Sequence, residues 1–184
     1  MQRQPLIIYV SGAPGSGKTT LAKRIANELY IPHVSSDLIH GGVKLTKRSH
    51  DRKETFHTIF VPLLVDMTKL RISFVVDHVL QKNMSESDVI EKLRPHAKIV
   101  YVHTQADNPI QRFYEREQRR TDKGVVLTPE QLQARRDYHQ KNLPNTQYPV
   151  DLNVPTIVVE TNDGYEPDFD RIIQMIEKLY KRED

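Results

Sequence analysis

The sequence predicts an α/β fold in which a parallel sheet is covered by helices on both faces. Three observations predict it. Short apolar runs typical of buried strands recur along the chain, amphipathic helical patterns lie between them, and a glycine-rich stretch joins the first strand to the first helix. Because strand and helix alternate, the strands should be parallel. Ligands bind beyond the carboxyl ends of strands in such sheets, so residues that follow strands are the first candidates for a site.

Each predicted element rests on its own pattern. Four runs of apolar, β-branched or aromatic residues indicate buried strands at Leu6–Val10, Ser73–Val76, Lys98–His103 and Thr156–Glu160, and a weaker run indicates one at His33–Ser35. Apolar residues spaced three to four apart predict amphipathic helices at Gly17–Leu29, Glu54–Leu70 and Asp168–Tyr180. The chain has 184 residues and no evident repeat or linker, so we expect a single domain over residues 1–184.

Composition excludes several classes of protein. Hydrophobic residues make up 38% and charged residues 28%, which is typical of a globular domain and not of a disordered chain. The absence of cysteine excludes disulfides and thiolate catalysis. The net charge of +3 is a mild preference for anionic partners, weaker than that of a dedicated nucleic-acid binder. Since no apolar run approaches the roughly 20 residues that span a bilayer, we expect a cytoplasmic protein.

The stretch SGAPGSGKTT, residues 11–20, predicts a site for a nucleoside triphosphate. It matches the pattern G-x-x-x-x-G-K-[ST] at every fixed position, with a predicted strand before it and a predicted helix after it. Backbone N–H groups of such a loop point at phosphate oxygens, Lys18 reaches the β- and γ-phosphates, and the Thr19 hydroxyl holds Mg²⁺. The expected cofactors are therefore ATP and Mg²⁺. The expected nucleotide-binding residues of this stretch are Gly12, Ala13, Pro14, Gly15, Ser16, Gly17, Lys18, Thr19 and Thr20.

Two aspartates follow predicted strands. Asp37 comes just after His33–Ser35, where a carboxylate could accept the proton of an attacking hydroxyl. The alternative is a helix N-cap at Asp37. Asp77 ends the run that follows Ser73, as the second Mg²⁺-associated carboxylate of a triphosphate site does, and its alternative is a turn residue. The neighbouring His78 is expected to be structural or to line the substrate site, since a lone histidine lacks the partners of a zinc site.

Basic residues recur on one face of a predicted helix in the stretch NPIQRFYEREQRRTDKG. Arg112, Arg116 and Arg120 are four apart, and like charges stacked in this way repel unless an anion lies between them. A triphosphate would be such an anion, and transferred phosphoryl groups need positive charge. The alternative is a solvated basic face. After the last predicted strand, a polar turn containing Asn162 could contact the nucleotide base or could be a simple turn.

A second basic segment begins three residues after Asp37. The stretch HGGVKLTKRSHDRK, residues 40–53, carries five lysines and arginines against one aspartate. It could bind an anionic acceptor, such as a sugar acid, a phosphorylated metabolite or a nucleic-acid end. The alternative is a solvated loop. Because aromatic residues for base stacking are missing until Phe56, a small-molecule acceptor ranks above a polynucleotide.

These motifs together resemble the P-loop small kinases of the adenylate-kinase-like group. The resembling stretches are SGAPGSGKTTLAKRIA, SSDLI, FVVDHV, IVYVHTQADNPIQRFYERE and TIVVETNDGYEPD. The group includes gluconate kinase, chloramphenicol phosphotransferase, zeta-toxin kinases and 5′-polynucleotide kinases, and such chains are often labelled AAA family ATPases. The resemblance implies a three-layer P-loop fold with a five-stranded parallel sheet of order 2-3-1-4-5 and an arginine lid at about residues 112–142. It also implies that Asp37 is the base and that Arg112 and Arg116 are lid arginines.

The chain departs from parts of that group. Polynucleotide kinases tend to carry an arginine-aspartate pair where this chain has Ser36-Asp37, and the arginine pattern of a true adenylate kinase is missing. We therefore predict a phosphotransferase that moves the γ-phosphate of ATP to a hydroxyl of a small-molecule acceptor, with Lys18, Asp37, Arg112 and Arg116 as catalytic residues and Thr19 and Asp77 at the metal. A 5′-polynucleotide or nucleoside kinase is the first alternative. A P-loop ATPase switch or regulatory nucleotide-binding protein is the alternative of another class.

Overall fold

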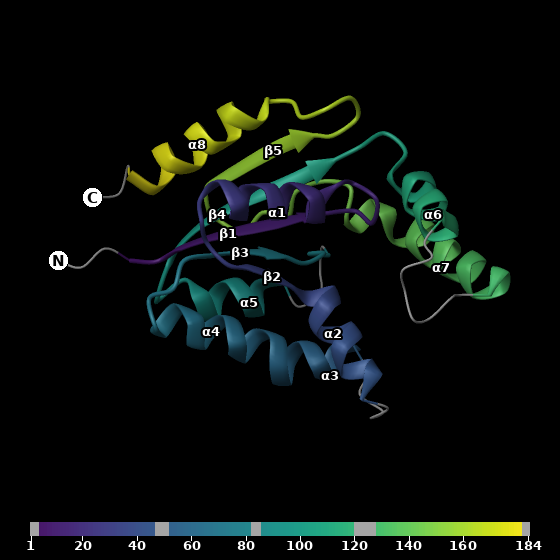
Figure 1. Cartoon of the computed structure of the whole chain (residues 1–184), viewed down its shortest axis with the longest axis horizontal. Coiled ribbons are helices and arrows are strands. Elements are labelled where there is room, and N and C mark those ends of the chain that lie inside the picture. The colour runs from purple at the N-terminus through teal and green to yellow at the C-terminus, as the bar shows by residue number, and fades with distance from the viewer. Residues whose placement is uncertain (1–3, 47–51, 82–85, 120–127, 182–184) are drawn as a thin grey trace.

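A computed structural model shows three layers, a five-stranded sheet between two sets of helices (Figure 1). It describes residues 4–46, 52–81, 86–119 and 128–181. The sheet is parallel throughout and has the order β2-β3-β1-β4-β5, as the resemblance implied. The strands are β1 (Leu6–Gly12), β2 (His33–Ser35), β3 (Phe74–Asp77), β4 (Lys98–Gln105) and β5 (Thr156–Glu160). All five predicted strands are therefore present.

The helices divide between the faces of the sheet and its carboxyl end. The first and last, α1 (Lys18–Glu28) and α8 (Phe169–Lys181), cover one face, and α4 (Val61–Lys69) and α5 (Glu86–Leu93) cover the other. Figure 1 shows the remaining helices beyond the carboxyl ends of the strands, with α2 and α3 on one side and α6 and α7 on the other. These are α2 (Ser36–Leu45), α3 (Arg52–Thr55), α6 (Pro109–Arg119) and α7 (Pro129–Asn142), and a short 3₁₀ turn at Leu143–Asn145 follows α7.

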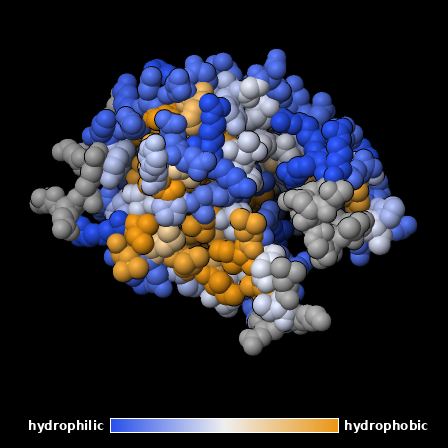
Figure 2. All heavy atoms as spheres, in the orientation of Figure 1, coloured by the Kyte–Doolittle hydropathy of each residue, from blue (hydrophilic) through white to orange (hydrophobic). Residues whose placement is uncertain are grey.

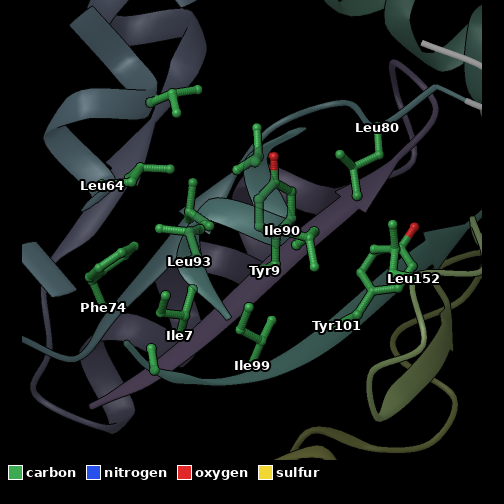
Figure 3. Packing of buried hydrophobic residues seen from close by; sticks show 14 of the residues in the cluster. Ile7, Tyr9, Leu64, Phe74, Leu80, Ile90, Leu93, Ile99, Tyr101 and Leu152 are labelled. Carbon is green, nitrogen blue, oxygen red and sulfur yellow. The ribbon is translucent and has the colours of Figure 1, made fainter. Parts of the chain in front are cut away.

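The central strand β1 holds the two cores together because its side chains alternate between the faces. Ile7 and Tyr9 point to the side of α4 and α5, while Ile8 and Val10 point to the side of α1 and α8. All four are fully buried. Figure 3 shows the first of these cores, in which Ile7 and Tyr9 lie among side chains of the helix layer and of neighbouring strands. Fully burying an aliphatic side chain contributes about 1.5–3 kcal/mol, so this strand fixes the position of the loop that follows it.

Some predicted elements differ in detail. The helix predicted at Glu54–Leu70 is present as α3, a π-helical segment (Phe56–Phe60) and α4. The segment from His40, for which a solvated loop was one prediction, is instead helical as far as Leu45, and Arg52 and Lys53 begin α3. Lys47, Arg48 and Asp51 of that segment lie outside the described residues.

The expectation that Thr156–Glu160 forms a fully buried strand is wrong, because β5 is buried on one face only. Its residues alternate between exposed and buried, and Val158 is 40% exposed. The reason is its position at the edge of the sheet, where α8 packs against one face of β5 only. Apolar alternation with period two, and not a continuous apolar run, is the pattern of such a strand.

Exposed apolar side chains gather on the outer side of the helix layer that contains α4. Figure 2 shows this apolar patch below an otherwise hydrophilic face. Its exposed members include Ile59, Leu63, Leu70 and Ile72. In the described part of the chain no helix is long and apolar enough to cross a membrane.

Candidate active site

The glycine-rich stretch forms a tight loop between β1 and α1. Gly12, Gly15 and Gly17 all have positive φ angles, of 146°, 87° and 83°. A side chain at Gly15 would meet the carbonyl oxygen of Pro109 on α6, and one at Gly12 would meet Thr104 on β4. The glycines are therefore required both by the backbone conformation and by close approach of neighbouring elements. The result is a backbone cradle at the N-terminus of α1, where N–H groups and the helix dipole favour an anion.

Two threonines that sequence reasoning passed over hold this loop in place. Thr104 Oγ1 donates to the Ser11 carbonyl at 3.1 Å, so the 2.6 Å contact between Ser16 Oγ and Thr104 Oγ1 has the serine as donor. Thr161 Oγ1, at the end of β5, donates to the Ser16 carbonyl at 2.9 Å. Both threonines are buried. The loop is thus pinned by β4 and β5 as well as by its own strand, and a strand-terminal threonine gives no sequence signal for such a role.

Lys18, the first residue of α1, is buried with 8% exposure. Burial lowers the pKa of its ammonium, and Arg116 and Arg52 lower it further. The carboxylates of Asp37 and Asp77 act in the opposite direction and raise that pKa. The charges of two predicted acids and of two basic side chains therefore act on this amine. A polyphosphate in the adjoining cradle would favour its charged form in the same way as the carboxylates do.

The oxygen donors expected to hold a metal lie together. Thr19 Oγ1 donates to Asp77 Oδ1 at 3.3 Å, and Asp77, at the end of β3, is 1% exposed. Its second oxygen accepts from His33 Nε2 at 2.7 Å, which fixes the carboxylate in place. A hydroxyl and one carboxylate are hard oxygen ligands that suit Mg²⁺ in a site completed by phosphates and water. The described residues contain no group of three or more histidine, aspartate or glutamate side chains that could hold a metal alone.

Asp37 lies in the first turn of α2, and its side chain is 60% exposed. Ser35 occupies the N-cap position of this helix, so the alternative of Asp37 as the cap is wrong. The carboxylate forms an ion pair with Arg52 of α3. Negative charge in a first turn still contributes about 0.3–1 kcal/mol through the helix dipole. The carboxylate nonetheless acts on the Lys18 ammonium, whose pKa it raises.

His78 follows Asp77 and packs between α2 and the π-helical segment. Its ring stacks on Phe56 with a centroid distance of 4.6 Å, and its Nδ1 lies 2.9 Å from Ser36 Oγ. Burial lowers the pKa of His78 to about 4, with Arg52 acting in the same direction. The imidazole is therefore neutral near pH 7. This agrees with the expectation of a structural or substrate-lining residue.

The predicted basic helix is α6, and its arginines have different surroundings. Arg112 Nη1 donates to the Thr161 carbonyl at 2.9 Å, which ties α6 to the end of β5. Arg116 pairs with the adjacent Glu117 at 3.3 Å and acts on the Lys18 ammonium. Arg120 lies outside the described residues. Arg116 is thus an arginine of α6 whose charge acts on the P-loop lysine, while closure of a lid over residues 112–142 remains a prediction.

A histidine that was not predicted is also coupled electrostatically to these groups. His139 of α7 packs edge-on against Phe113 of α6 at 4.9 Å between ring centroids. Burial lowers the pKa of His139 to about 4, and Lys18, Arg135 and Arg52 lower it further while Asp37 raises it. It therefore lies within electrostatic reach of both the P-loop lysine and the predicted base. Nothing in the polar sequence around it distinguishes this histidine from a surface residue.

Asn162, expected at the nucleotide base, lies in the turn after β5. Its side-chain oxygen accepts from the backbone N–H of Asp107 at 2.9 Å, so it joins the β5–α8 turn to the β4–α6 turn. Its role toward a base remains a prediction. Of the predicted residues, Thr19 and Asp77 are hydrogen-bonded to each other, and Asp37, Asp77 and Arg116 all act electrostatically on Lys18. Arg112 and Asn162 are hydrogen-bonded to Thr161 and to Asp107 beside the end of β5.

Comparison with known families agrees with this geometry. The sequence profile of AAA_33, an AAA domain, matches residues 7–141. The chain belongs to this family. Adenylate kinase from Chlamydia trachomatis serovar L2 is 50% identical over 44 residues, which cover 23% of this chain and 18% of that enzyme. Cytidylate kinase from Pyrobaculum aerophilum is 59% identical over 34 residues, 18% of either chain. The chain thus matches less than a fifth of the length of these two relatives.

Solved structures share the fold over nearly the whole chain. A presumed kinase from Chloroflexus aurantiacus has a TM-score of 0.71 at 18% identity, with 97% of both chains covered. A gluconokinase from Sinorhizobium meliloti has a TM-score of 0.59 at 19% identity and covers 98% of this chain and 96% of its own. Shikimate kinase from Acinetobacter baumannii in complex with shikimate has a TM-score of 0.53 at 20% identity, with the same coverage. The predicted resemblance to P-loop kinases is confirmed for the fold.

Proposed function

We propose that this protein is an ATP-dependent kinase that transfers the γ-phosphate to a hydroxyl of a small-molecule acceptor. The observation that carries the proposal is that the carboxylates of Asp37 and Asp77, which follow β2 and end β3, both act on the buried Lys18 ammonium at the glycine cradle after β1. A positive charge for the phosphates, a fixed carboxylate for the metal and an exposed carboxylate for the acceptor are the groups that phosphoryl transfer requires. Gluconokinase and shikimate kinase among the similar structures support a small-molecule acceptor.

The roles follow from the surroundings of each side chain. The cradle from Gly12 to Thr20 would bind the triphosphate, and Lys18 would hold its β- and γ-phosphates. Thr19 and Asp77 would hold Mg²⁺, which when bound neutralises charge on the phosphate oxygens. Arg116 would stabilise negative charge that develops on the transferred group.

Asp37 is the residue we assign as general base. The acceptor hydroxyl attacks the γ-phosphorus, its proton passes to the Asp37 carboxylate, and ADP leaves with the electrons of the broken P–O bond. The partly exposed position of Asp37 allows an acceptor to reach it, whereas the buried Asp77 is held by His33 and Thr19. This contrast assigns the two carboxylates to two different tasks.

The experiment that tests the function is a phosphorylation screen with γ-labelled ATP and Mg²⁺ over sugars, sugar acids, nucleosides, aminoglycoside and chloramphenicol-type alcohols, and 5′-hydroxyl oligonucleotides. We expect label in a small acceptor and an ATP hydrolysis rate that rises only with that acceptor. Transfer to oligonucleotides alone would favour the polynucleotide kinase. Fast hydrolysis that no acceptor changes would favour an ATPase switch.

Asp37→Asn tests the assigned base. The amide keeps the size of the side chain but cannot take a proton, so phosphoryl transfer should fall by about two decades or more while ATP affinity stays near that of the wild type. The loss of first-turn charge should lower stability by at most about 1 kcal/mol. ATP binding by calorimetry and transfer by label incorporation measure the two quantities. Wild-type transfer in this variant would remove Asp37 from the mechanism.

A further inference from the structure

We propose that His33 is a positioning residue for the metal site, whose imidazole N–H holds one oxygen of Asp77 so that the other is presented to Thr19 and to the Mg²⁺ of a bound nucleotide. The inference rests on the proposed function and deepens it, since it names a residue on which the strength of metal binding depends. The contact behind it is the 2.7 Å hydrogen bond between His33 Nε2 and Asp77 Oδ2. An ionised carboxylate can only accept, so the imidazole carries the proton of this bond.

The alternation of side chains along β2 and β3 brings these groups to the same face of the sheet. Val34 and Val76 pack in the core on the side of α4 and α5. Because neighbouring residues of a strand point to opposite faces, His33 and Asp77 point to the other side, that of α1, which carries Thr19. The pairing of β2 with β3 in the sheet therefore sets the contact, and not the conformation of a loop.

The bond to His33 is the shortest of the three that side chains of the described residues make with this carboxylate. It joins Oδ2, at 2.7 Å, while Thr19 Oγ1 and Ser35 Oγ lie 3.3 Å and 3.5 Å from Oδ1. Bonds from hydroxyls are usually about 2.7–2.8 Å long, so these two are weak. Thr19 is also an expected ligand, whose oxygen would turn its lone pairs to the metal. His33 is therefore the group that fixes the orientation of Asp77.

Water has little access to this hydrogen bond. The side chain of His33 is 13% exposed and that of Asp77 is 1% exposed. A hydrogen bond in such a low-dielectric surrounding is stronger than one in water. Removal of a group that hydrogen-bonds to a metal ligand typically lowers metal affinity by about 10–100-fold. We therefore expect loss of the His33 donor to weaken Mg²⁺ binding by that order.

The test measures nucleotide binding and needs no acceptor. The dissociation constant of AMP-PNP, an ATP analogue that is not hydrolysed, is determined by calorimetry in excess EDTA and again in saturating Mg²⁺. The ratio of the two constants is the contribution of the metal to nucleotide binding. His33→Phe keeps a planar ring but has no donor, so this ratio should fall about tenfold or more, while the affinity in EDTA stays at the wild-type value. A ratio equal to that of the wild type overturns the proposal.

Two further variants separate the hydrogen bond from packing. His33→Gln keeps an N–H at a similar reach, so it should restore part of the ratio that His33→Phe loses. Equal losses in these two variants would assign the effect to packing and contradict the role of the N–H. His103→Gln is the matched control, since this strand histidine is buried and hydrogen-bonded to Tyr101 and Gln147. It has no hydrogen bond to Asp77, and its ratio should equal that of the wild type.

A double-variant cycle tests whether His33 acts through Asp77. Asp77→Asn should lower the ratio at least as much as His33→Phe does, and the double variant should lower it no further than Asp77→Asn alone. Additive losses would contradict the positioning role. If Mg²⁺ strengthens AMP-PNP binding equally in the wild type and in His33→Phe, the role of His33 is wrong and the proposed function stands. If the wild type binds no AMP-PNP with or without Mg²⁺, the proposed function itself is wrong.

Discussion

At the scale of single residues, opposing electrostatic effects act on Lys18. Its ammonium is buried at the start of α1, where burial and two arginines lower its pKa while two carboxylates raise it. A buried charge is costly unless partners compensate, and the lowered pKa indicates that burial outweighs the two carboxylates here. Such a residue persists when a ligand uses its charge. We therefore expect its removal to affect turnover and not folding.

Lys18→Ala should abolish triphosphate turnover, because the point charge at the β- and γ-phosphates is lost. Its melting temperature should equal or exceed that of the wild type. ATP turnover and thermal unfolding of the same preparation measure both effects, and Lys23→Ala, an exposed lysine of the same helix, is the control. Turnover at the wild-type rate would contradict the P-loop assignment.

The two expected metal ligands lead to a second prediction, that turnover depends on Mg²⁺. Thr19 and Asp77 supply two oxygens, and a polyphosphate and water would supply the others. Excess EDTA should therefore stop turnover, and added Mg²⁺ should restore it. Thermal stability without nucleotide should not change with EDTA, because the described residues offer no complete metal site of their own. Full activity in EDTA would show that transfer needs no metal.

Residues with a fixed motif could be predicted from the sequence, and residues that act through tertiary contacts could not. Lys18 and Thr19 follow from their spacing in one loop. Thr161 holds the same loop from 145 positions away, and only the fold brings it there. Arg52 lies within the segment that the sequence marked as basic, but charge density alone does not identify Asp37 as its partner.

At the scale of elements, α6 combines a structural arginine with one that faces the cradle. Arg112 donates to the Thr161 carbonyl, and Arg116 acts on Lys18. Arg112→Ala should lower the free energy of unfolding by about 0.5–1.5 kcal/mol, the usual worth of one hydrogen bond. Arg116→Ala should leave stability nearly unchanged and lower kcat more than it weakens ATP binding, by as much as about three decades if it acts as a true arginine finger.

Urea unfolding and steady-state kinetics of the two variants measure this division. Arg136→Ala is a control on α7, since its guanidinium lies over the Tyr114 ring and donates to Gln111 of α6. If neither Arg112→Ala nor Arg116→Ala changes kcat, α6 is a solvated basic face. If Arg112→Ala changes kcat more than Arg116→Ala, the roles are reversed.

Elements with strong apolar periodicity were the predictable ones. The pattern at β1 and α1 predicts both elements because their buried faces are regular. The helix α7 has one buried side chain, Leu132, and so no apolar stripe to predict it. Its start is instead fixed by a capping box at Thr128 and Gln131. A short signal of this kind is common in loops as well.

At the scale of the whole molecule, alternation of strand and helix predicts a parallel sheet but not its order. The order β2-β3-β1-β4-β5 followed from the resemblance, since no local pattern states which strands are neighbours. The crossover places β1 between β3 and β4. The cradle, Asp77 and Thr104 therefore all lie at the carboxyl ends of the strands. The site is thus a consequence of the topology, and it draws basic side chains and histidines from both ends of the chain.

Several histidines in this arrangement are held neutral, which makes the stability of the whole molecule depend on pH. Burial lowers the pKa of His78 and of His139 to about 4. Burial also lowers the pKa of His103, which donates to the Gln147 carbonyl and lies 2.8 Å from the Tyr101 hydroxyl. In the unfolded chain each of them takes up a proton near pH 6.5. Between pH 6.5 and 4 the unfolded state therefore binds more protons.

It follows that the free energy of unfolding falls as pH is lowered from 6.5 to 4. His139→Gln should reduce this fall by about 2 kcal/mol, since one pKa unit corresponds to about 1.4 kcal/mol and solvent at the partly exposed ring weakens the effect. Urea unfolding of the wild type and the variant at pH 7 and at pH 4.5 measures the difference. His96→Gln, a substitution at an exposed histidine, is the control variant. If the stability of His139→Gln has the same pH dependence as that of the wild type, the fold does not lower the pKa of His139.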